Sequence, residues 1–385
     1  MKAVQIITWL RKLVLGFLGI CLAGFTFMWL VFWYMFGSIS AFPNFMHTYF
    51  VATQAFINPV EKSTLLTGML KGMISSLAEK HSTYLDQDDF KGMMEQTNAS
   101  YSGIGVVIGK TDEGVAAVTV MEGQPAETAG IQEGDLILAI DGVDTSTLSL
   151  DQVSSRIRGQ SGTTVNLTIR HDGQDRDLTV ERETISLPTV RGRMLTDDIG
   201  YIKISQFAEP TGQDFAKEYK ALQEQGMKRL VLDLRNNPGG LLTTATAIAD
   251  YILPAGPFVT VQARGGPDES YNSSDTEEPI PLVVLVNGSS ASASEIIAGA
   301  VQDEKAGVVL GTQTYGKGTV QNILRNFDGQ AIKVTIAKYH TPNDRVIDGT
   351  GIKPDIEFPL PDGVRPFWKD NDPQIDKAIE VVQTL

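Results

Sequence analysis

Residues 13–36 form one uninterrupted apolar run, LVLGFLGICLAGFTFMWLVFWYMF, and no other feature of the sequence restricts the fold as much. The run has 24 residues without a charge. As an α-helix rising about 1.5 Å per residue it reaches about 36 Å, enough to cross a bilayer. Lys2, Arg11 and Lys12 precede it, and no charge follows until Glu61. This asymmetry predicts a single-pass cell-membrane helix with its N-terminus in the cytoplasm and the remaining chain outside.

The apolar run is also compatible with two kinds of cleaved signal. A secretory signal would use Ser38 and Ser40 as small residues before a cut, although the apolar core of a signal usually spans only about 7–15 residues. A lipoprotein signal at Cys21 fits less well, because Ile20 precedes it and the apolar run continues beyond it. In all three cases the rest of the chain leaves the cytoplasm.

Composition excludes several classes of protein. Cys21 is the only cysteine, so no intrachain disulfide and no multi-cysteine metal site can form. After Lys12 the chain carries 29 basic residues against 46 acidic ones. Such an acidic surface disfavours binding to nucleic acid or to anionic lipid. With only four histidines besides, we expect neither a metal nor another cofactor.

Beyond the apolar run the pattern of apolar residues and glycines changes twice along the sequence. Residues 44–79 place apolar side chains at spacings of three and four, which predicts helices. Residues 101–181 read as short strands separated by glycines, with a hairpin turn at Asp172-Gly173 and a helix over 149–157. From about Leu187 onward, strand and helix signals alternate as in α/β folds.

Two segments of this last region share one plan, an apolar strand, a polar turn and a helix. They are LVLDLRNNPGGLLTTATAIADYIL, from Leu230, and PLVVLVNGSSASASEIIAGAVQDE, from Pro281. In each, the free amides of a helix N-terminus lie beside the carboxyl end of a strand, a usual place for a site. The spacing of Ser292 and Glu295 is by itself that of a capping box, a structural feature.

The strand-rich region resembles a PDZ domain. The loop YSGIGV at residues 101–106 is followed by GQPAETAGIQEGDLILAIDG at 123–142, in the order found in that family. The resemblance implies binding of a peptide as an added strand, with its terminal carboxylate held by loop amides. It assigns tail binding to Gly103, Ile104, Gly105 and Val106.

The whole chain from about residue 60 to 358 resembles the carboxyl-terminal processing (tail-specific) peptidases, serine proteases that use a Ser/Lys dyad and carry a PDZ domain. The motifs that carry the resemblance are YIKISQF at 201–207, DLRNNPGG at 233–240, NGSSASASE at 287–295, YGKGTVQ at 315–321 and YHTPNDRVIDGTGIKPD at 339–355. The resemblance implies a crotonase-like or ClpP-like α/β core. It also implies protein substrates with apolar, disordered C-terminal tails that are cut near that end.

The family roles fall on specific positions of this sequence. Ser292 matches the nucleophile, Lys317 the general base and Gln321 the residue that orients the lysine. A serine hydroxyl needs a base, and a lysine with its usual pKa of about 10.4 is protonated at neutral pH. We therefore expect Lys317 to be desolvated beside Ser292 with no carboxylate partner.

The remaining roles concern charge stabilisation and regulation. The family forms its oxyanion hole from the amide after the nucleophile, here Ala293, and from the PGG turn, where Gly239 is our assignment and Gly240 the alternative. An arginine of the PDZ domain couples tail binding to cleavage in the family, and Arg158 is our candidate. Whether an activating partner is needed stays open.

Other mechanisms fit the residues less well. GTQTYGKG at 311–318 resembles a phosphate-binding loop, but Gly318 stands where a hydroxyl should hold Mg²⁺. A Ser-His-Asp triad would require a histidine, and no serine lies in a G-x-S-x-G elbow. The main rival is a catalytically silent, membrane-tethered PDZ scaffold. Retention of Ser292, Lys317 and Gln321 together argues against it.

The predicted architecture is therefore α/β with an inserted PDZ domain and an N-terminal membrane helix. We expect an anchor over 1–37, a helical segment packing on the core over 38–86, the PDZ domain over 87–185 and the protease core over 186–385. After Asp355 about thirty residues remain, too few for a wall-binding domain. We accordingly expect the N-terminal helix to be the tether and a membrane or envelope protein to be the substrate.

Overall fold

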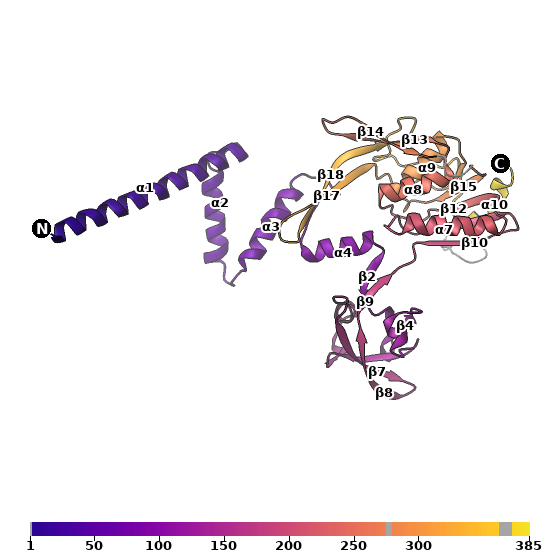
Figure 1. The fold of residues 1–385 in the computed structure, drawn as a ribbon, viewed down its shortest axis with the longest axis horizontal. Coiled ribbons are helices and arrows are strands. Elements are labelled where there is room, and N and C mark those ends of the chain that lie inside the picture. The colour runs from indigo at the N-terminus through magenta and orange to yellow at the C-terminus, as the bar shows by residue number, and fades with distance from the viewer. Residues whose placement is uncertain (1, 275–278, 362–371) are drawn as a thin grey trace. The chain divides into compact units, whose positions relative to one another are not determined.

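The computed structural model describes residues 2–274, 279–361 and 372–385 (Figure 1). The chain divides into two compact units, one ending at Ala78 and one beginning at Glu79. The first unit is helical, and the second holds the strands of the chain that the structure describes. Each unit is considered by itself.

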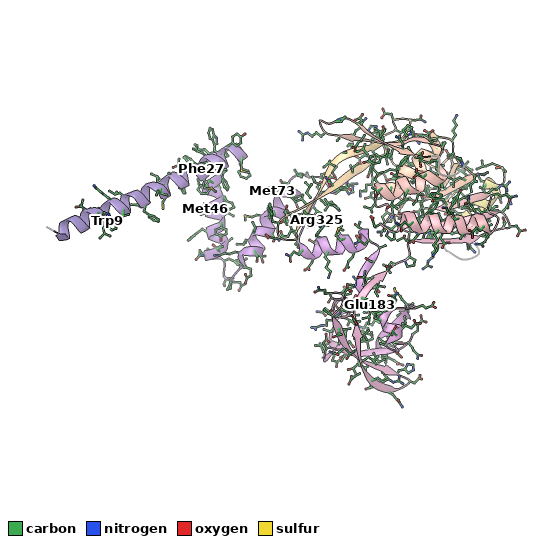
Figure 2. All side chains as sticks on the ribbon, in the orientation of Figure 1. Trp9, Phe27, Met46, Met73, Glu183 and Arg325 are labelled. Carbon is green, nitrogen blue, oxygen red and sulfur yellow. The ribbon has the colours of Figure 1, made fainter. Side chains whose placement is uncertain are left out.

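The first unit begins with a long helix, α1 (Lys2–Phe36), that has the length and composition to cross a membrane over Thr8–Phe36. Figure 2 shows side chains such as Trp9 and Phe27 extending from it into open space. The chain then turns back, so that the Phe42 ring of α2 (Ala41–Phe50) lies 5.1 Å from the Phe25 ring. A π-helical turn (Val51–Ala55) and α3 (Lys62–Ser75) follow. The helices predicted within 44–79 are confirmed.

The second unit contains a small module with one six-stranded sheet and two helices. Its predicted hairpin is confirmed, since Asp172 and Gly173 have φ of +46° and +76° and the flanking strands pair. Its helix is also confirmed, because the Ser149 hydroxyl accepts from Gln152 N at the predicted N-cap. The elements are β3 (Val106–Thr111), β4 (Gly114–Val120), α5 (Pro125–Thr128), β5 (Leu136–Ile140), β6 (Val143–Asp144), α6 (Leu150–Ile157), β7 (Thr164–His171) and β8 (Gln174–Glu181).

An antiparallel ribbon leads into and out of this module. It pairs β2 (Ser100–Gly103) with β9 (Glu183–Ser186). Helix α4 (Gln87–Thr97) precedes the ribbon, and its N-cap Asp86 accepts from Asp89 N at 3.0 Å. The backbone at the end of α4 accepts hydrogen bonds from Gln206 and from Glu209 N.

A six-stranded sheet forms the centre of the larger α/β region. Its strands occur in the order β10 (Val190–Met194), β11 (Ile199–Ile204), β12 (Arg229–Asp233), β15 (Leu282–Val286), β16 (Val308–Gly311) and β19 (Ile356–Glu357), all parallel except β10. Buried residues alternate between the two faces, as the period of a strand requires. Leu230 and Leu232 pack in the cluster that contains α7 (Thr211–Glu224), α8 (Leu242–Ile252) and α9 (Ala293–Asp303). Val231 packs in the cluster that contains α10 (Pro373–Val382).

A second, antiparallel sheet carries a long hairpin. The hairpin joins β17 (Thr319–Arg325) to β18 (Ala331–His340) through a turn that contains Asp328-Gly329. On its other side β18 pairs with β1 (Thr83–Leu85) and with β13 (Gly256–Ala263), which pairs in turn with β14 (Glu269–Ser273). The fold is thus the predicted mixture of α/β core and inserted β module.

Candidate active site

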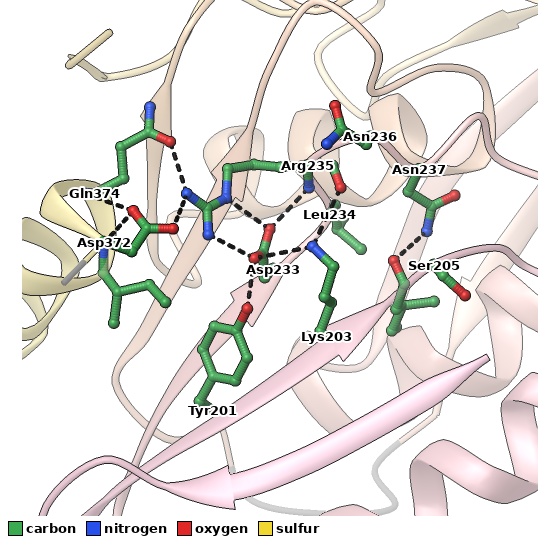
Figure 3. A network of polar contacts seen from close by, with 12 residues as sticks. Tyr201, Lys203, Ser205, Asp233, Leu234, Arg235, Asn236, Asn237, Asp372 and Gln374 are labelled. Atoms are coloured by element: carbon green, nitrogen blue, oxygen red, sulfur yellow. Dashed lines mark hydrogen bonds and ion pairs between the residues drawn. The ribbon is translucent and has the colours of Figure 1, made fainter. Parts of the chain in front are cut away.

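The turn after β12 is held by a buried ionic network (Figure 3). Arg235 and Asp233 are both fully buried, and the guanidinium donates to the two carboxylate oxygens at 2.9 and 2.7 Å. A further Arg235 nitrogen lies 2.8 Å from the Asp372 carboxylate and donates to Gln374 at 2.8 Å. Tyr201 donates to Asp233 at 2.6 Å. These contacts of Arg235 connect the turn to the N-terminus of α10.

This network fixes the charge states of its members. Burial alone would raise the pKa of Asp233, but the hydrogen bonds and charge of Arg235 outweigh burial and hold the pKa below its usual range. Burial and the Asp233 charge raise the pKa of the Tyr201 phenol. Asp233 consequently stays ionised, and the backbone that follows it enters the PGG turn from a rigid base.

Three serines in the turn after β15 and the first turn of α9 have different roles, Ser290, Ser292 and Ser294. Ser290 and Ser294 are fully buried and donate to the carbonyls of Leu234 and Asn237, at 2.8 and 3.0 Å. These two hydroxyls tie the second turn to the first. Ser292 instead lines a cavity of about 360 Å³. Of these three serines, Ser292 is the one that lines the cavity.

Ser292 has an unusual backbone conformation. It stands at the N-cap of α9 with φ of +54° and ψ of −115°, and its surface is only 5% exposed. Positive φ is uncommon for a residue with a side chain and is stored strain, often found at functional sites. Gly239 lies against it, since a Cβ at Gly239 would come within 2.8 Å of the Ser292 Cβ. Only a glycine leaves room for the turn to approach this closely.

Glu295 joins Ser292 to the loop that carries Lys317. Its fully buried carboxylate accepts from Ser292 N at 2.9 Å, as a capping box requires. It also accepts from the Thr314 hydroxyl at 2.5 Å, from Gly316 N at 2.7 Å and from Lys317 N at 2.8 Å. The sequence-based prediction of Glu295 as a cap is correct, but the spacing did not indicate its link to residues 314–317.

Lys317 lies in the loop between β16 and β17, and its side chain also lines the cavity. Burial lowers its pKa, and the nearby charge of Lys333 lowers it further. Among the described residues Lys317 forms no ion pair. A phosphate-binding loop would need a serine or threonine at position 318. Only glycine fits there, because a Cβ would lie 2.2 Å from Asp348 N. The loop leads into a strand, whereas a phosphate-binding loop leads into a helix.

Gln321 follows on β17, beyond a register shift between Val320 and Gln321. Its amide nitrogen donates to the hydroxyls of Thr319 at 2.8 Å and Thr335 at 3.2 Å. Gln321 lines the same cavity as Ser292 and Lys317. No histidine is found among the described residues that line this cavity.

Tyr339 is a member of the site that the sequence interpretation did not single out. It lines the cavity, and burial raises the pKa of its phenol to about 12, while a hydrogen bond with Ser292 acts in the opposite direction. The phenol therefore stays protonated beside the serine at neutral pH. Tyr339 is the first residue of YHTPNDRVIDGTGIKPD, one of the motifs that carry the resemblance, and this position could have indicated its place in the site.

The backbone amides expected to form an oxyanion hole lie in both turns. Ala293 begins α9, and its nitrogen lies 2.9 Å from where a Cβ of Gly239 would stand. The Gly239 amide donates to the Asn237 side chain at 2.9 Å, so it is engaged in this structure. Gly239, Gly240 and Ser292 all line the cavity. Either glycine of the PGG turn is therefore a candidate for the second oxyanion-hole amide.

The β module has a groove of its own, about 370 Å³ in volume. Gly103, Ile104 and Val106 line it opposite Leu150 and Ser154 of α6. Ile104 is only 1% exposed and thus contributes mainly to the module's core. Gly105 does not line the groove but turns the chain there, with φ of +78° and no space for a Cβ beside Gln124.

Arg158 ends α6 at one end of this groove. Its guanidinium lies 4.9 Å from the centre of the Tyr101 ring and 3.9 Å from the Glu95 carboxylate. Tyr101 belongs to the ribbon and Glu95 to α4, so Arg158 touches both segments that connect the module to the rest of the chain. No group of three or more potential metal ligands occurs in the described part of the chain.

Comparison with known proteins agrees with this geometry. Residues 198–358 match peptidase family S41, and residues 117–171 match the PDZ domain. The chain is 36% identical over 323 residues to the carboxy-terminal-processing protease of Bartonella bacilliformis, covering 81% of this chain and 74% of that protein. It is 40% identical over 304 residues to the carboxyl-terminal-processing protease of Synechocystis, covering 76% of this chain and 71% of that protein. Among solved structures, the photosystem II D1 C-terminal processing protease is similar with a TM-score of 0.50 and 28% identity, covering 80% of this chain and 85% of that one.

Proposed function

The chain belongs to peptidase family S41 as a carboxyl-terminal processing serine protease, and on that premise we propose that it cleaves peptide bonds with a Ser292/Lys317 dyad. The observation that supports the dyad is the shared cavity. It brings a strained, cavity-facing serine together with a desolvated lysine that has no carboxylate partner among the described residues. Those are the two properties that a Ser/Lys mechanism requires.

Each step then follows from the residues at the cavity. The neutral Lys317 amine takes the proton from the Ser292 hydroxyl as its oxygen attacks the scissile carbonyl carbon. The oxyanion that forms accepts from the Ala293 amide and from Gly239 or Gly240. The Lys317 ammonium returns the proton to the departing amine. Water then repeats the sequence on the acyl-enzyme and restores Ser292.

The PDZ module supplies recognition in this proposal. A substrate's apolar C-terminal tail adds a strand along β3 in the groove lined by Gly103, Ile104 and Val106, with Gly105 shaping the carboxylate loop. Arg158, which touches both connecting segments, couples tail docking to the active site. The variant Arg158→Ala is expected to bind tails normally and to cleave more slowly. Equal binding and equal cleavage would remove this role.

Location and architecture complete the proposal. Helix α1 anchors the protein in the cell membrane with its N-terminus in the cytoplasm, because basic residues precede the apolar stretch. The catalytic and PDZ regions then act outside on membrane or envelope proteins. We also propose a crotonase-like or ClpP-like core, with the PDZ domain over 87–185, the protease core over 186–385 and residues 38–86 packing on the core.

The test uses the full chain in detergent, as wild type, Ser292→Ala and Lys317→Ala. The reporter is a disordered peptide ending in an apolar tail, with a second reporter ending in aspartates. We expect cleavage of the apolar reporter by the wild type alone, with a loss of at least about 10³-fold in each variant. Equal tail binding by all three proteins and cleavage by none would favour the silent scaffold instead.

A further inference from the structure

A half-buried carboxylate outside the dyad lies behind Gln321. Glu79 precedes β1, and its carboxylate accepts from the Thr335 hydroxyl at 2.7 Å and from the Ser82 hydroxyl at 2.7 Å. Its other oxygen accepts from His81 N at 3.0 Å. The Ser82 oxygen in turn accepts from Thr335 N at 3.0 Å. Three donors and a strand pairing therefore fix Glu79 against β18.

Thr335 is the link between Glu79 and the active site. It stands opposite Gln321 in the pairing of β17 with β18, and Gln321 donates to its hydroxyl at 3.2 Å. On the other side, β1 pairs with β18 two residues away, at Thr83 and Lys333. The Thr335 hydroxyl is consequently held between a carboxylate and an amide.

The direction of this chain of hydrogen bonds follows from proton counting. A carboxylate can only accept, and hydrogen bonds from Ser82, Thr335 and His81 hold the pKa of Glu79 at about 2 despite the opposing effect of burial. The single Thr335 proton must therefore go to Glu79, which leaves only lone pairs for Gln321. Gln321 must then present its NH₂ group to Thr335, so its carbonyl oxygen is left for another partner.

We propose that Glu79 is a positioning residue for proteolysis: acting through Thr335, it orients the Gln321 amide so that its carbonyl oxygen accepts from Lys317. An amide free to rotate would present NH₂ to the lysine in half of its orientations. That NH₂ would donate to the lone pair of the neutral amine, which is the lone pair that must take the serine proton. The inference depends on the proposed dyad and extends it from the cavity to the segment before β1.

Glu79 also acts on Lys317 through its charge. Its negative charge raises the pKa of Lys317 and so opposes the lowering by burial and by Lys333. Replacement of Glu79 by glutamine removes both the charge and the fixed direction of the hydrogen bonds. Replacement of Thr335 by valine removes the fixed direction of the hydrogen bonds but keeps the charge of Glu79. The charged and titratable groups near Lys317 are Glu79, Lys80, His81, Glu295 and Lys333.

The experiment measures the pH profile of kcat/KM for the full chain in detergent with the apolar-tailed reporter. For Glu79→Gln we expect a plateau roughly tenfold lower, because general-base catalysis depends on the oriented lysine. The acid limb of the profile should also move to lower pH, because Lys317 loses a neighbour that favours its protonated form. For Thr335→Val we expect the lower plateau with the acid limb unmoved.

Three controls separate this role from a structural one. Thr335→Ser keeps the hydroxyl and should keep the plateau, and Glu304→Gln, an exposed carboxylate, should change neither plateau nor limb. In a Gln321→Ala background, Glu79→Gln should lower the plateau no further, since the two residues act in one chain. Additive losses, or an unchanged plateau in Glu79→Gln, would overturn the inference. If Ser292→Ala abolishes cleavage while Glu79→Gln has no effect, this inference alone fails; if Ser292→Ala still cleaves, the proposed dyad fails as well.

Discussion

The two turns that form the site follow the same plan but are stabilised by different forces. After β12, buried charges hold the chain, with Arg235 between Asp233 and Asp372. After β15, neutral hydroxyls and one carboxylate hold it, and the backbone at Ser292 is strained. In the proposed mechanism the first turn supplies amides and does not move a proton. The second turn carries Ser292, the proposed nucleophile, and Glu295 links it to the loop of Lys317, the proposed base. A permanent cation beside this turn would hinder the proposed proton transfer.

The comparison shows that the turn after β12 provides rigidity, while the neighbouring turn after β15 carries the strained serine. A buried ion pair resists distortion because breaking it leaves a charge without a partner. A strained serine and a desolvated lysine have the opposite character, since both cost free energy in the folded state. Ser290 and Ser294 connect the turns, so the stable one supports the strained one.

Removal of Arg235 should give the largest effect on stability. In Arg235→Met the carboxylates of Asp233 and Asp372 stay buried and lose their shared cation, so we expect a loss of about 3–5 kcal/mol in the free energy of unfolding. Urea unfolding of the detergent-solubilised chain measures it. Arg229→Met, at a half-exposed pair with Asp198, is the control and should cost about 1 kcal/mol or less. Equal losses in both would contradict the division between the turns.

Glu295→Gln should have the next largest effect. A glutamine has one acceptor oxygen in place of two, so donors among Ser292 N, Thr314, Gly316 N and Lys317 N lose their partner. We expect a loss of about 1–3 kcal/mol together with a fall in kcat at nearly unchanged KM. Thr314→Val removes one of these donors and should cause a smaller fall. A stability loss with full activity would show that Glu295 does not align the two catalytic residues.

Asp233 and Lys317 should both make the protein more stable as the pH rises, but in different pH ranges. The folded pKa of Asp233 is lowered, so its contribution to stability is present at neutral pH and is lost as the pH falls through that folded pKa. The folded pKa of Lys317 is also lowered, so the folded state binds fewer protons than the unfolded state, and stability rises with pH between the folded pKa and about 10.4.

The contribution of Lys317 can be measured with a single variant. Lys317→Met should be more stable than the wild type at neutral pH, and this gain should shrink toward alkaline pH. Wild-type kcat/KM should rise with pH through the lowered pKa of Lys317, because only the neutral amine is a base. A lysine variant that is less stable at every pH would show that Lys317 contributes packing and not a desolvated charge.

The smallest effect is expected for the strain at Ser292. Ser292→Gly and Ser292→Ala both remove the nucleophile, but only glycine relaxes a φ of +54°. We expect the glycine variant to unfold at a higher temperature than the alanine variant, with a difference of about 1 kcal/mol. Equal melting temperatures would mean that the backbone at the nucleophile is not strained.

Local features of the sequence predicted local structure well. Asp172-Gly173 predicted a hairpin that the structure contains, and the helix predicted from Ser149 is also present. What escaped prediction depends on distant contacts. Glu295 has the spacing of a cap, and nothing near it in the sequence indicates residues 314–317. Glu79 and Thr335 are likewise 256 residues apart, so no periodicity connects them.

One contact in Figure 3 also concerns the order in which the chain is made. Arg235 donates to Gln374, which lies 139 residues later in the chain. During synthesis the turn after β12 therefore leaves the ribosome with Asp233 in place but before Asp372 and Gln374 have been made. The turn gains its remaining buried contacts only once α10 has been synthesised, so its final rigidity depends on a segment made much later.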